Sequence, residues 1–239
     1  CLDSGAPESV IDRSAAKDAG IATAGAGTIK GTGTGSVEAD FAPPLRLTIG
    51  RLNTTIERPR IIDLSVVLVP VRQAGLVGAE VFDKYVVRID PDRHRIAFID
   101  PNAFHAPRKA ASLPLELTNH RLYLNLYLEP RPGMGAVRRI RIDTGSEDSV
   151  DDDSVKKSAI VKETRLGNGL GDSYVGYSGV YSRVRVGRYV FKHVWGPAGA
   201  VPIIGMELMR RFTLTFDGRN GRLYLEPNRH LNEPVPAPE

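Results

Sequence analysis

The sequence predicts an all-β fold with a few short helices, built from two copies of one unit. Three observations carry this prediction: an Asp-hydroxyl-Gly turn that occurs twice, further landmarks that recur in the same order, and short runs in which apolar and polar residues alternate. The alternation is clearest in Leu45–Ile49 and is typical of strands with one buried face. The segments 54–62 and 66–69 are expected to be further strands, and 78–84 is expected to be a short helix on which Val81 and Phe82 face the core. We therefore expect two β-lobes related by a pseudo-two-fold axis, with a cleft between them.

The repeated turn follows a short apolar lead in both halves of the chain. An aspartate is followed by a hydroxyl residue and then by a glycine, which permits the backbone to turn sharply. One such tripeptide is a weak signal, because Asp and Gly are common in all turns. Two copies with matching surroundings are much stronger. The residues of the two turns are Asp3, Ser4, Gly5, Asp143, Thr144 and Gly145.

Further landmarks recur downstream of both turns. The two aspartates are 140 residues apart, and the separation of later landmarks falls to 137 and then to 127. A separation that only shrinks is expected when the second copy has shorter loops, so the chain reads as one duplication. The paired segments are Leu47–Arg51 with Val184–Arg188, Leu76–Glu80 with Ile203–Glu207, and Tyr85–Asp90 with Phe212–Asp217.

Composition limits the function classes. The net charge of +4 comes from basic residues that are spread along the chain, so a nucleic-acid surface is not expected. No apolar run approaches the roughly 20 residues of a membrane-spanning helix. Cys1 is the single cysteine, which excludes an intrachain disulfide. The five histidines lack metal-ligand spacing, and we expect neither a metal nor a cofactor.

With these residues in view, the chain resembles the aspartic proteases, specifically a retropepsin-like half fused to a second copy of itself. The resemblance implies a bilobal aspartic protease fold in which Asp3 and Asp143 share one proton and activate a water. It also implies that Ser4 and Thr144 hydrogen-bond across to the opposite turn. Behind each turn the family places an apolar-apolar-Gly turn. Here those residues are Leu76, Val77, Gly78, Ile203, Ile204 and Gly205.

The same resemblance assigns two flap hairpins over a substrate. Glycine-rich segments stand at both expected places, at 25–35 and at 167–179. A mobile surface loop is the alternative for the first segment, and the two tyrosines of the second could simply fill a pleated face. A phosphate cradle at 25–35 is not expected, because no strand feeds it and its Lys is out of position. The candidate flap residues are Thr28, Ile29, Lys30, Gly31, Tyr174 and Tyr177.

The expected organisation is an N-terminal lobe at 1–100, a linker at 101–112, a C-terminal lobe at 113–227 and a Pro-rich tail at 228–239, which is expected to be frayed from residue 230 onward. Two strand-like runs precede Asp143, whereas two residues precede Asp3, so the first copy is expected to lack its N-terminal hairpin. If a signal peptide precedes Cys1, the protein would be exported. Asp151–Ser154 is acidic; helix capping is favoured there over a calcium site.

The function that these residues predict is aspartic-type endopeptidase activity of a monomer on a polypeptide held between the lobes. Two crowded carboxyl groups cannot both be ionised, so one can deprotonate a water while the other protonates the carbonyl oxygen. Two alternatives remain: a catalytically silent binding or scaffold domain of the same fold, and an Asp-dependent hydrolase of another substrate class. Glu147 and Asp148 add negative charge just after the second turn, and the sequence does not predict the effect of this charge on Asp3 and Asp143.

Overall fold

The computed structural model describes residues 1–31, 33–50, 52–67, 73–167 and 169–237. Most of the regular structure in these ranges is β-strand, accompanied by short helices, so the chain is an all-β protein. No helix in the described ranges is long and apolar enough to cross a membrane.

The first half of the chain contains the smaller elements. Its helices are α1 (Arg13–Asp18), the 3₁₀ helix η1 (Leu64–Val66) and α2 (Glu80–Lys84). Its strands are β1 (Val10–Asp12), β2 (Gly25–Ile29), β3 (Val37–Phe41), β4 (Leu45–Ile49), β5 (Leu52–Ile56), β6 (Arg60–Ile62), β7 (Gly75–Leu76), β8 (Val86–Asp90) and β9 (Arg95–Ile99).

The second half has longer strands. Its helices are η2 (Asp153–Lys157), a 3₁₀ helix, and α3 (Met206–Met209). Its strands are β10 (Ala111–Pro114), β11 (Glu116–Thr118), β12 (Arg121–Glu129), β13 (Ala136–Ile142), β14 (Val150–Asp151), β15 (Val161–Leu166), β16 (Tyr174–Val186), β17 (Tyr189–Pro197), β18 (Ile203–Ile204), β19 (Phe212–Asp217) and β20 (Arg222–Pro227).

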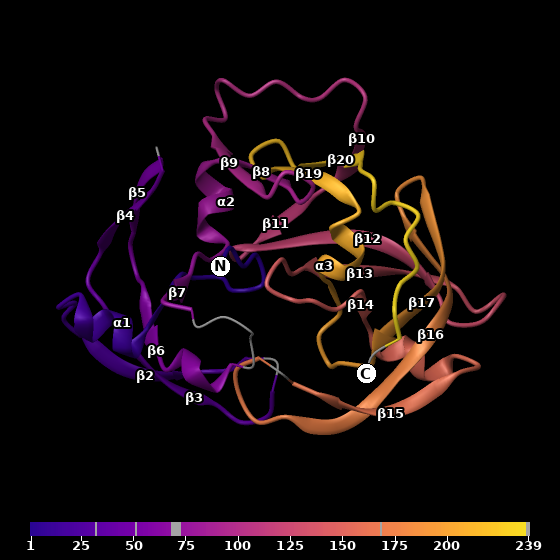
Figure 1. Ribbon diagram of the computed structural model, residues 1–239, viewed down its shortest axis with the longest axis horizontal. Coiled ribbons are helices and arrows are strands. Elements are labelled where there is room, and N and C mark those ends of the chain that lie inside the picture. The colour runs from indigo at the N-terminus through magenta and orange to yellow at the C-terminus, as the bar shows by residue number, and fades with distance from the viewer. Residues whose placement is uncertain (32, 51, 68–72, 168, 238–239) are drawn as a thin grey trace.

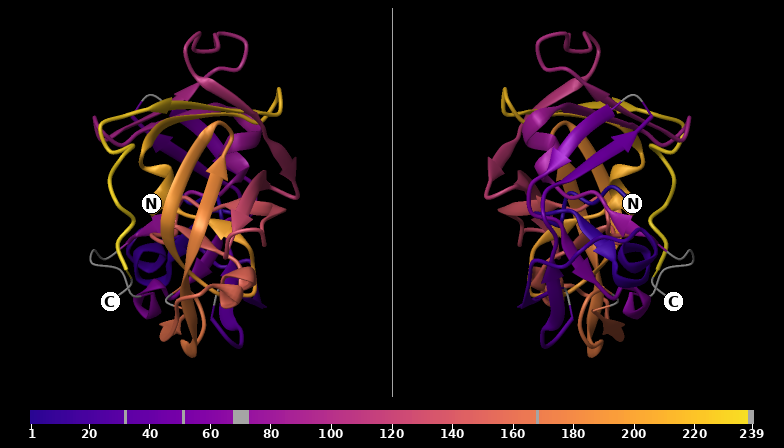
Figure 2. Two further views of the ribbon diagram at one scale, coloured as in Figure 1. Left: turned by 90° about the vertical axis from the view of Figure 1, so that its right-hand side faces the viewer. Right: turned by 90° about the vertical axis from the view of Figure 1, so that its left-hand side faces the viewer.

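Each half has its own sheet. In the first half the strand order is β2-β3-β6-β1-β7, and in the second it is β14-β18-β13-β12-β16-β15 with β17 paired to β16. Figure 2 shows β16 and β17 as a long hairpin along the side of the second half. The β12 strand shows why apolar residues alternate along the sequence: its leucines at even positions, from Leu122 to Leu128, all point into the core and are buried.

A further sheet joins the two halves. Its order is β10-β20-β19-β8-β9, so β8 of the first half pairs antiparallel with β19 of the second, with Ile89 opposite Leu214. This sheet lies at the top of Figure 1, and the loop between β9 and β10 extends beyond it. Phe82 of α2 packs edge-on against Phe216 beneath the sheet. The largest hydrophobic cluster therefore contains residues of both halves.

Two expected strands differ from the structure. The run 54–62 was expected to be one strand, but β5 ends at Ile56 and β6 begins at Arg60. Pro59 lies in the break, and a proline has no N–H to donate to a strand ladder. The run 66–69 was also expected to be a strand. Val66 instead ends the 3₁₀ helix η1, and positions 68 and 69 lie outside the described residues.

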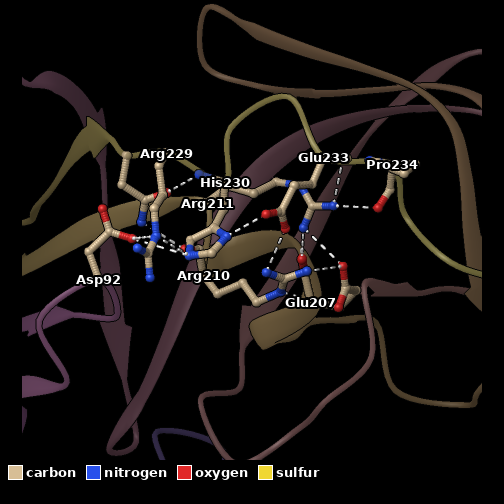
Figure 3. Close-up of polar contacts among 9 residues, drawn as sticks. Asp92, Glu207, Arg210, Arg211, Arg229, His230, Glu233 and Pro234 are labelled. Carbon is tan, nitrogen blue, oxygen red and sulfur yellow. Dashed lines mark hydrogen bonds and ion pairs between the residues drawn. The ribbon is translucent and has the colours of Figure 1, made fainter.

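The expectation that the chain is frayed from residue 230 to 239 is wrong for the described part of that segment. Arg211 on the turn after α3 is fully buried, and its guanidinium donates hydrogen bonds to the backbone oxygens of Glu233 at 3.0 Å and Pro234 at 3.1 Å. Figure 3 shows these contacts beside the ion pair between Arg210 and Glu233, whose atoms lie 2.8 Å apart. Leu231 and Val235 pack against the main core. Buried polar anchoring thus holds this segment in place.

Candidate functional site

The structure brings Asp3 and Asp143, the aspartate pair, together from opposite halves. Asp143 follows the end of β13, and Asp3 follows Leu2, which forms a parallel bridge with Val77. The backbone N–H of Asp3 donates to the Val77 oxygen at 2.9 Å, and that of Asp143 donates to the Ile204 oxygen at 3.0 Å. The N–H of each aspartate therefore makes the same hydrogen bond to the apolar-apolar-Gly turn of its own half.

The two apolar-apolar-Gly turns are built alike. Gly78 and Gly205 are both buried, and a Cβ atom on either would lie 2.5 Å from the backbone of the chain segment just after the aspartate turn. That backbone atom belongs to Glu8 in the first half and to Asp148 in the second, again 140 residues apart. A side chain at either glycine would push the aspartate turn away from its support. The lack of space for a side chain therefore explains why glycine ends the apolar-apolar-Gly turn in both halves.

Hydrogen bonds cross between the two aspartate turns in a reciprocal pattern. The Ser4 N–H donates to Thr144 Oγ1 at 3.0 Å, and the Thr144 N–H donates to Ser4 Oγ at 3.1 Å. Each hydroxyl then donates to the opposite strand, Ser4 to the Ile142 oxygen at 2.8 Å and Thr144 to the Leu2 oxygen at 2.9 Å. Four hydrogen bonds therefore fix the two turns, and their aspartates, relative to each other.

Each carboxyl group accepts a hydrogen bond from the glycine of its own turn. The Gly5 N–H donates to Asp3 Oδ1 at 2.8 Å, and the Gly145 N–H donates to Asp143 Oδ1 at 3.1 Å. The Asp3 carboxyl is also hydrogen-bonded to that of Asp143. A Cβ atom at Gly5 would lie 2.2 Å from Asp143 Oδ2, and one at Gly145 would lie 2.6 Å from Asp3 Cγ. Glycine is required at both positions because each faces the opposite carboxyl group.

The electrostatics of the pair favour one shared proton. Burial, together with the negative charge of Asp143, raises the pKa of Asp3 to about 7. The Gly5 and Ala6 N–H groups oppose this, because they stabilise the ionised carboxylate. The Asp143 residue is only 7% exposed. Between acid and neutral pH, the arrangement thus favours a protonated Asp3 next to its partner.

Two hairpins meet at their tips. The β2–β3 hairpin and the β15–β16 hairpin approach each other along the lower edge of Figure 1. The Gly33 N–H donates to the Leu170 oxygen at 2.9 Å, and Thr34 and Asp172 exchange two backbone hydrogen bonds of 2.9 and 3.1 Å. Leu170 packs on the hydrophobic cluster of the first half that contains Val10. The tips are therefore joined across the two halves.

The candidate flap residues lie on or beside these hairpins. Thr28 and Ile29 end β2, and Ile29 packs on the first-half cluster, whereas Lys30 and Gly31 follow in the exposed tip. Tyr174 begins β16 and is half-buried, while Tyr177 is 46% exposed. Because their positions differ by an odd number in a strand, the two tyrosine side chains point to opposite faces. They cannot both face the aspartate pair.

Comparison with known proteins finds similar chains among solved structures. No family model and no curated protein matches the chain. Among solved structures, a retropepsin-like aspartic protease from Rickettsia conorii is similar over 51% of this chain and 95% of its own length. The sequence identity is 19% and the TM-score is 0.37.

Arg141 also belongs to the site, and sequence analysis did not single it out. Its Nη2 lies 3.4 Å from Asp143 Oδ2, and the side chain is 13% exposed. The signal was available, because a residue two positions before Asp143 on a strand points to the same face. Among the described residues, no other cation lies within ion-pair distance of either aspartate.

The acidic residues after the second turn do not assemble a metal site. Asp152 accepts the Ser154 N–H at 2.9 Å and caps η2, which is the capping arrangement that the sequence favoured. Asp151 accepts the Gly199 N–H, and burial raises its pKa to about 7. Desolvation raises the pKa of Asp148, and the charge of Asp143 adds to the effect. Across the described ranges, no group of three or more His, Cys, Asp or Glu side chains could hold an ion.

Proposed function

We propose that this chain is an aspartic-type endopeptidase. The observation that carries the proposal is the hydrogen-bonded pair of carboxyl groups from Asp3 and Asp143, each seated on the N–H of its own turn glycine. The reciprocal hydrogen bonds between Ser4 and Thr144 support it, because they fix the relative position of the two carboxyls without involving them. In the proposed enzyme the joined hairpin tips would cover the site and would have to open for a polymeric substrate.

The chemistry requires one proton on the pair. The ionised carboxylate takes a proton from a bound water as the water oxygen attacks the carbonyl carbon of the peptide bond. The protonated carboxyl gives its proton to the carbonyl oxygen, which produces a neutral tetrahedral diol. Collapse of the diol breaks the C–N bond, and a proton moves to the departing nitrogen. Neither carboxyl group can perform both transfers alone.

The proposal extends to the organisation of the chain. The lobe at 1–100 would supply one carboxyl group and the lobe at 113–227 the other, with 101–112 as the connection. The polypeptide substrate would lie between the lobes, beneath the hairpins that carry Thr28–Gly31 and Tyr174. The shared β8–β19 pairing would keep the two lobes in one unit while the hairpins move.

Cleavage of an unstructured polypeptide tests the proposal. We expect the protein to cut such a substrate at acid pH, and Asp3→Asn or Asp143→Asn to reduce the rate by about 10²–10⁴-fold. The double variant should be no slower than either single variant, because the two residues act as a unit. Asp18→Asn, which removes an exposed carboxyl at the end of α1, is the matched control and should leave the rate unchanged.

Three further results decide between the alternatives. A metal chelator should leave the rate unchanged. Activity that survives in either single variant would remove the shared-proton mechanism. Failure of the wild-type protein to cut any of a varied set of polypeptides, with the fold intact, would favour a silent binding domain.

A further inference from the structure

We propose that Arg141 makes the two aspartates unequal: its guanidinium keeps Asp143 ionised as the base, which leaves the shared proton on Asp3 as the acid. The ion pair between Arg141 Nη2 and Asp143 Oδ2, at 3.4 Å, carries this inference. The kinetic consequence rests on the proposed peptidase function, whereas the ionisation of the pair does not.

Arg141 is held where it can act on Asp143. Arg141 is the penultimate residue of β13 and Asp143 directly follows the strand, two positions further on, so their side chains leave the chain on the same side. The β13 strand is flanked on both sides, by Tyr123 of β12 and Ile203 of β18, and the Arg141 N–H donates to the Pro202 oxygen at 2.9 Å. The backbone beneath the guanidinium is therefore fixed, and the side chain is largely buried.

The contact falls on the oxygen that the turn leaves free. Asp143 Oδ1 accepts the Gly145 N–H, while Oδ2 faces Arg141 on one side and the opposite turn on the other. A positive charge at this distance favours the ionised form of a carboxyl group and opposes its protonation. No such contact exists for Asp3 within the described ranges. The residue that corresponds to Arg141 in the first half is Cys1, which is exposed and carries no cationic side chain.

The other charged and titratable groups around this contact are acidic or neutral. Asp3 faces Asp143 from the opposite half, and Glu147 and Asp148 lie in the loop that follows the turn. Asp151 on β14 interacts electrostatically with Arg141, and Tyr123 lies opposite it on β12. These acids raise the cost of a second negative charge on the pair. Arg141 is the counter-charge that permits one aspartate to stay ionised among them.

The test is the pH dependence of cleavage in Arg141→Leu and Arg141→Lys. Removal of the cation should raise the pH at which the acid limb of the profile reaches half-maximum by about 1–3 pH units, because an opposite charge nearby lowers a carboxyl pKa by about that amount. Arg141→Lys should restore most of the wild-type profile. Arg139→Leu is the matched control: it removes a cation two residues away that pairs with Glu116, and its profile should match the wild type.

A second measurement does not depend on cleavage. Carbon-13 NMR of aspartate-labelled protein follows the carboxyl titrations, with Asp3→Asn and Asp143→Asn used to assign the signals. In Arg141→Leu the first titration of the aspartate pair should lie at higher pH than in the wild type, because the cation that favours an ionised carboxyl is gone. Superimposable titrations in the two proteins would overturn the inference. If the wild type lacks cleavage but the titrations differ, the proposed function fails and the inference about Arg141 stands.

Discussion

Asp3 and Asp143 sit in turns of the same design, but the two halves of the chain surround those turns differently. The backbone geometry is repeated almost bond for bond: each aspartate N–H donates to the second residue of an apolar-apolar-Gly turn, and each carboxyl accepts its own turn glycine. The side chains around them are not repeated. Asp143 has Arg141 beside it, whereas Asp3 has Cys1 at the corresponding position.

The cores of the halves differ as well. The second half, together with α2 and β8 of the first, forms one large hydrophobic cluster. The remaining part of the first half has two small clusters, one around Val10 and Ile62 and one around Ala16 and Ile61. The comparison teaches that matching backbone turns place the two carboxyl groups alike, while the side chains and hydrophobic clusters around them differ between the halves.

The hydroxyl residues between the turns offer the largest test of this comparison. Ser4 is fully buried and Thr144 is partly exposed, although their hydrogen bonds are reciprocal. Ser4→Ala should lower the free energy of unfolding by about 1–3 kcal/mol, because it leaves the Thr144 N–H and the Ile142 oxygen without a partner in a buried place. Thr144→Val should cost less, because water can reach the groups that it leaves.

Chemical denaturation measures both changes, with Ser112→Ala as a control at an exposed serine of β10. The control should change the free energy of unfolding by no more than about 0.5 kcal/mol. Equal losses of unfolding free energy in Ser4→Ala and Thr144→Val would show that the two hydroxyl residues stabilise the turns equally. That result would contradict the difference expected from their burial.

A smaller effect is expected in the pH dependence of stability. The pKa of Asp3 is about 7 in the folded protein and has its ordinary value of 3.8 in the unfolded chain, so the folded state binds the proton more tightly. The contribution to the free energy of unfolding is therefore fully present below pH 3.8 and is lost as the pH rises to about 7. Asp3→Asn should remove that loss, so the free energy of unfolding should depend less on pH than in the wild type.

Melting temperatures from acid to neutral pH measure this effect. Asp151 contributes a slope of the same sign, since burial raises its pKa to about 7 as well, and it remains in the variant. The slope should therefore decrease in Asp3→Asn and not disappear. Asp18→Asn, an exposed control, should follow the wild-type curve. A variant whose stability depends on pH as steeply as the wild type would show that Asp3 is already ionised in the fold at mildly acidic pH.

Much of the site could be predicted because its determinants are local. An aspartate, a hydroxyl residue and a glycine in sequence fix a turn, and their recurrence 140 residues later indicated that Asp3 and Asp143 occupy equivalent places. The helix α2 with Val81 and Phe82 buried followed from the apolar spacing of a short segment. Such features depend on a few neighbouring residues.

The features that escaped sequence analysis depend on contacts between distant segments. The packing of Leu170 on the first-half cluster requires both hairpins to be in place, and nothing near residue 170 encodes it. The anchoring of Glu233 and Pro234 by Arg211 similarly depends on burial of a guanidinium that looks exposed in the sequence. Arg141 is different: strand alternation could have placed it beside Asp143, but an arginine in a strand more often faces solvent.

Neutron diffraction of the deuterium-exchanged protein tests the shared proton most directly. In a crystal grown at mildly acidic pD, the account predicts one deuterium on the two carboxyl groups together, bound to Asp3 and directed at an ionised Asp143 that faces Arg141. A deuterium on Asp143 with Asp3 ionised would contradict the role given to Arg141. Two carboxylates without a deuterium, or two carboxyl groups turned away from each other, would contradict the aspartate pair itself.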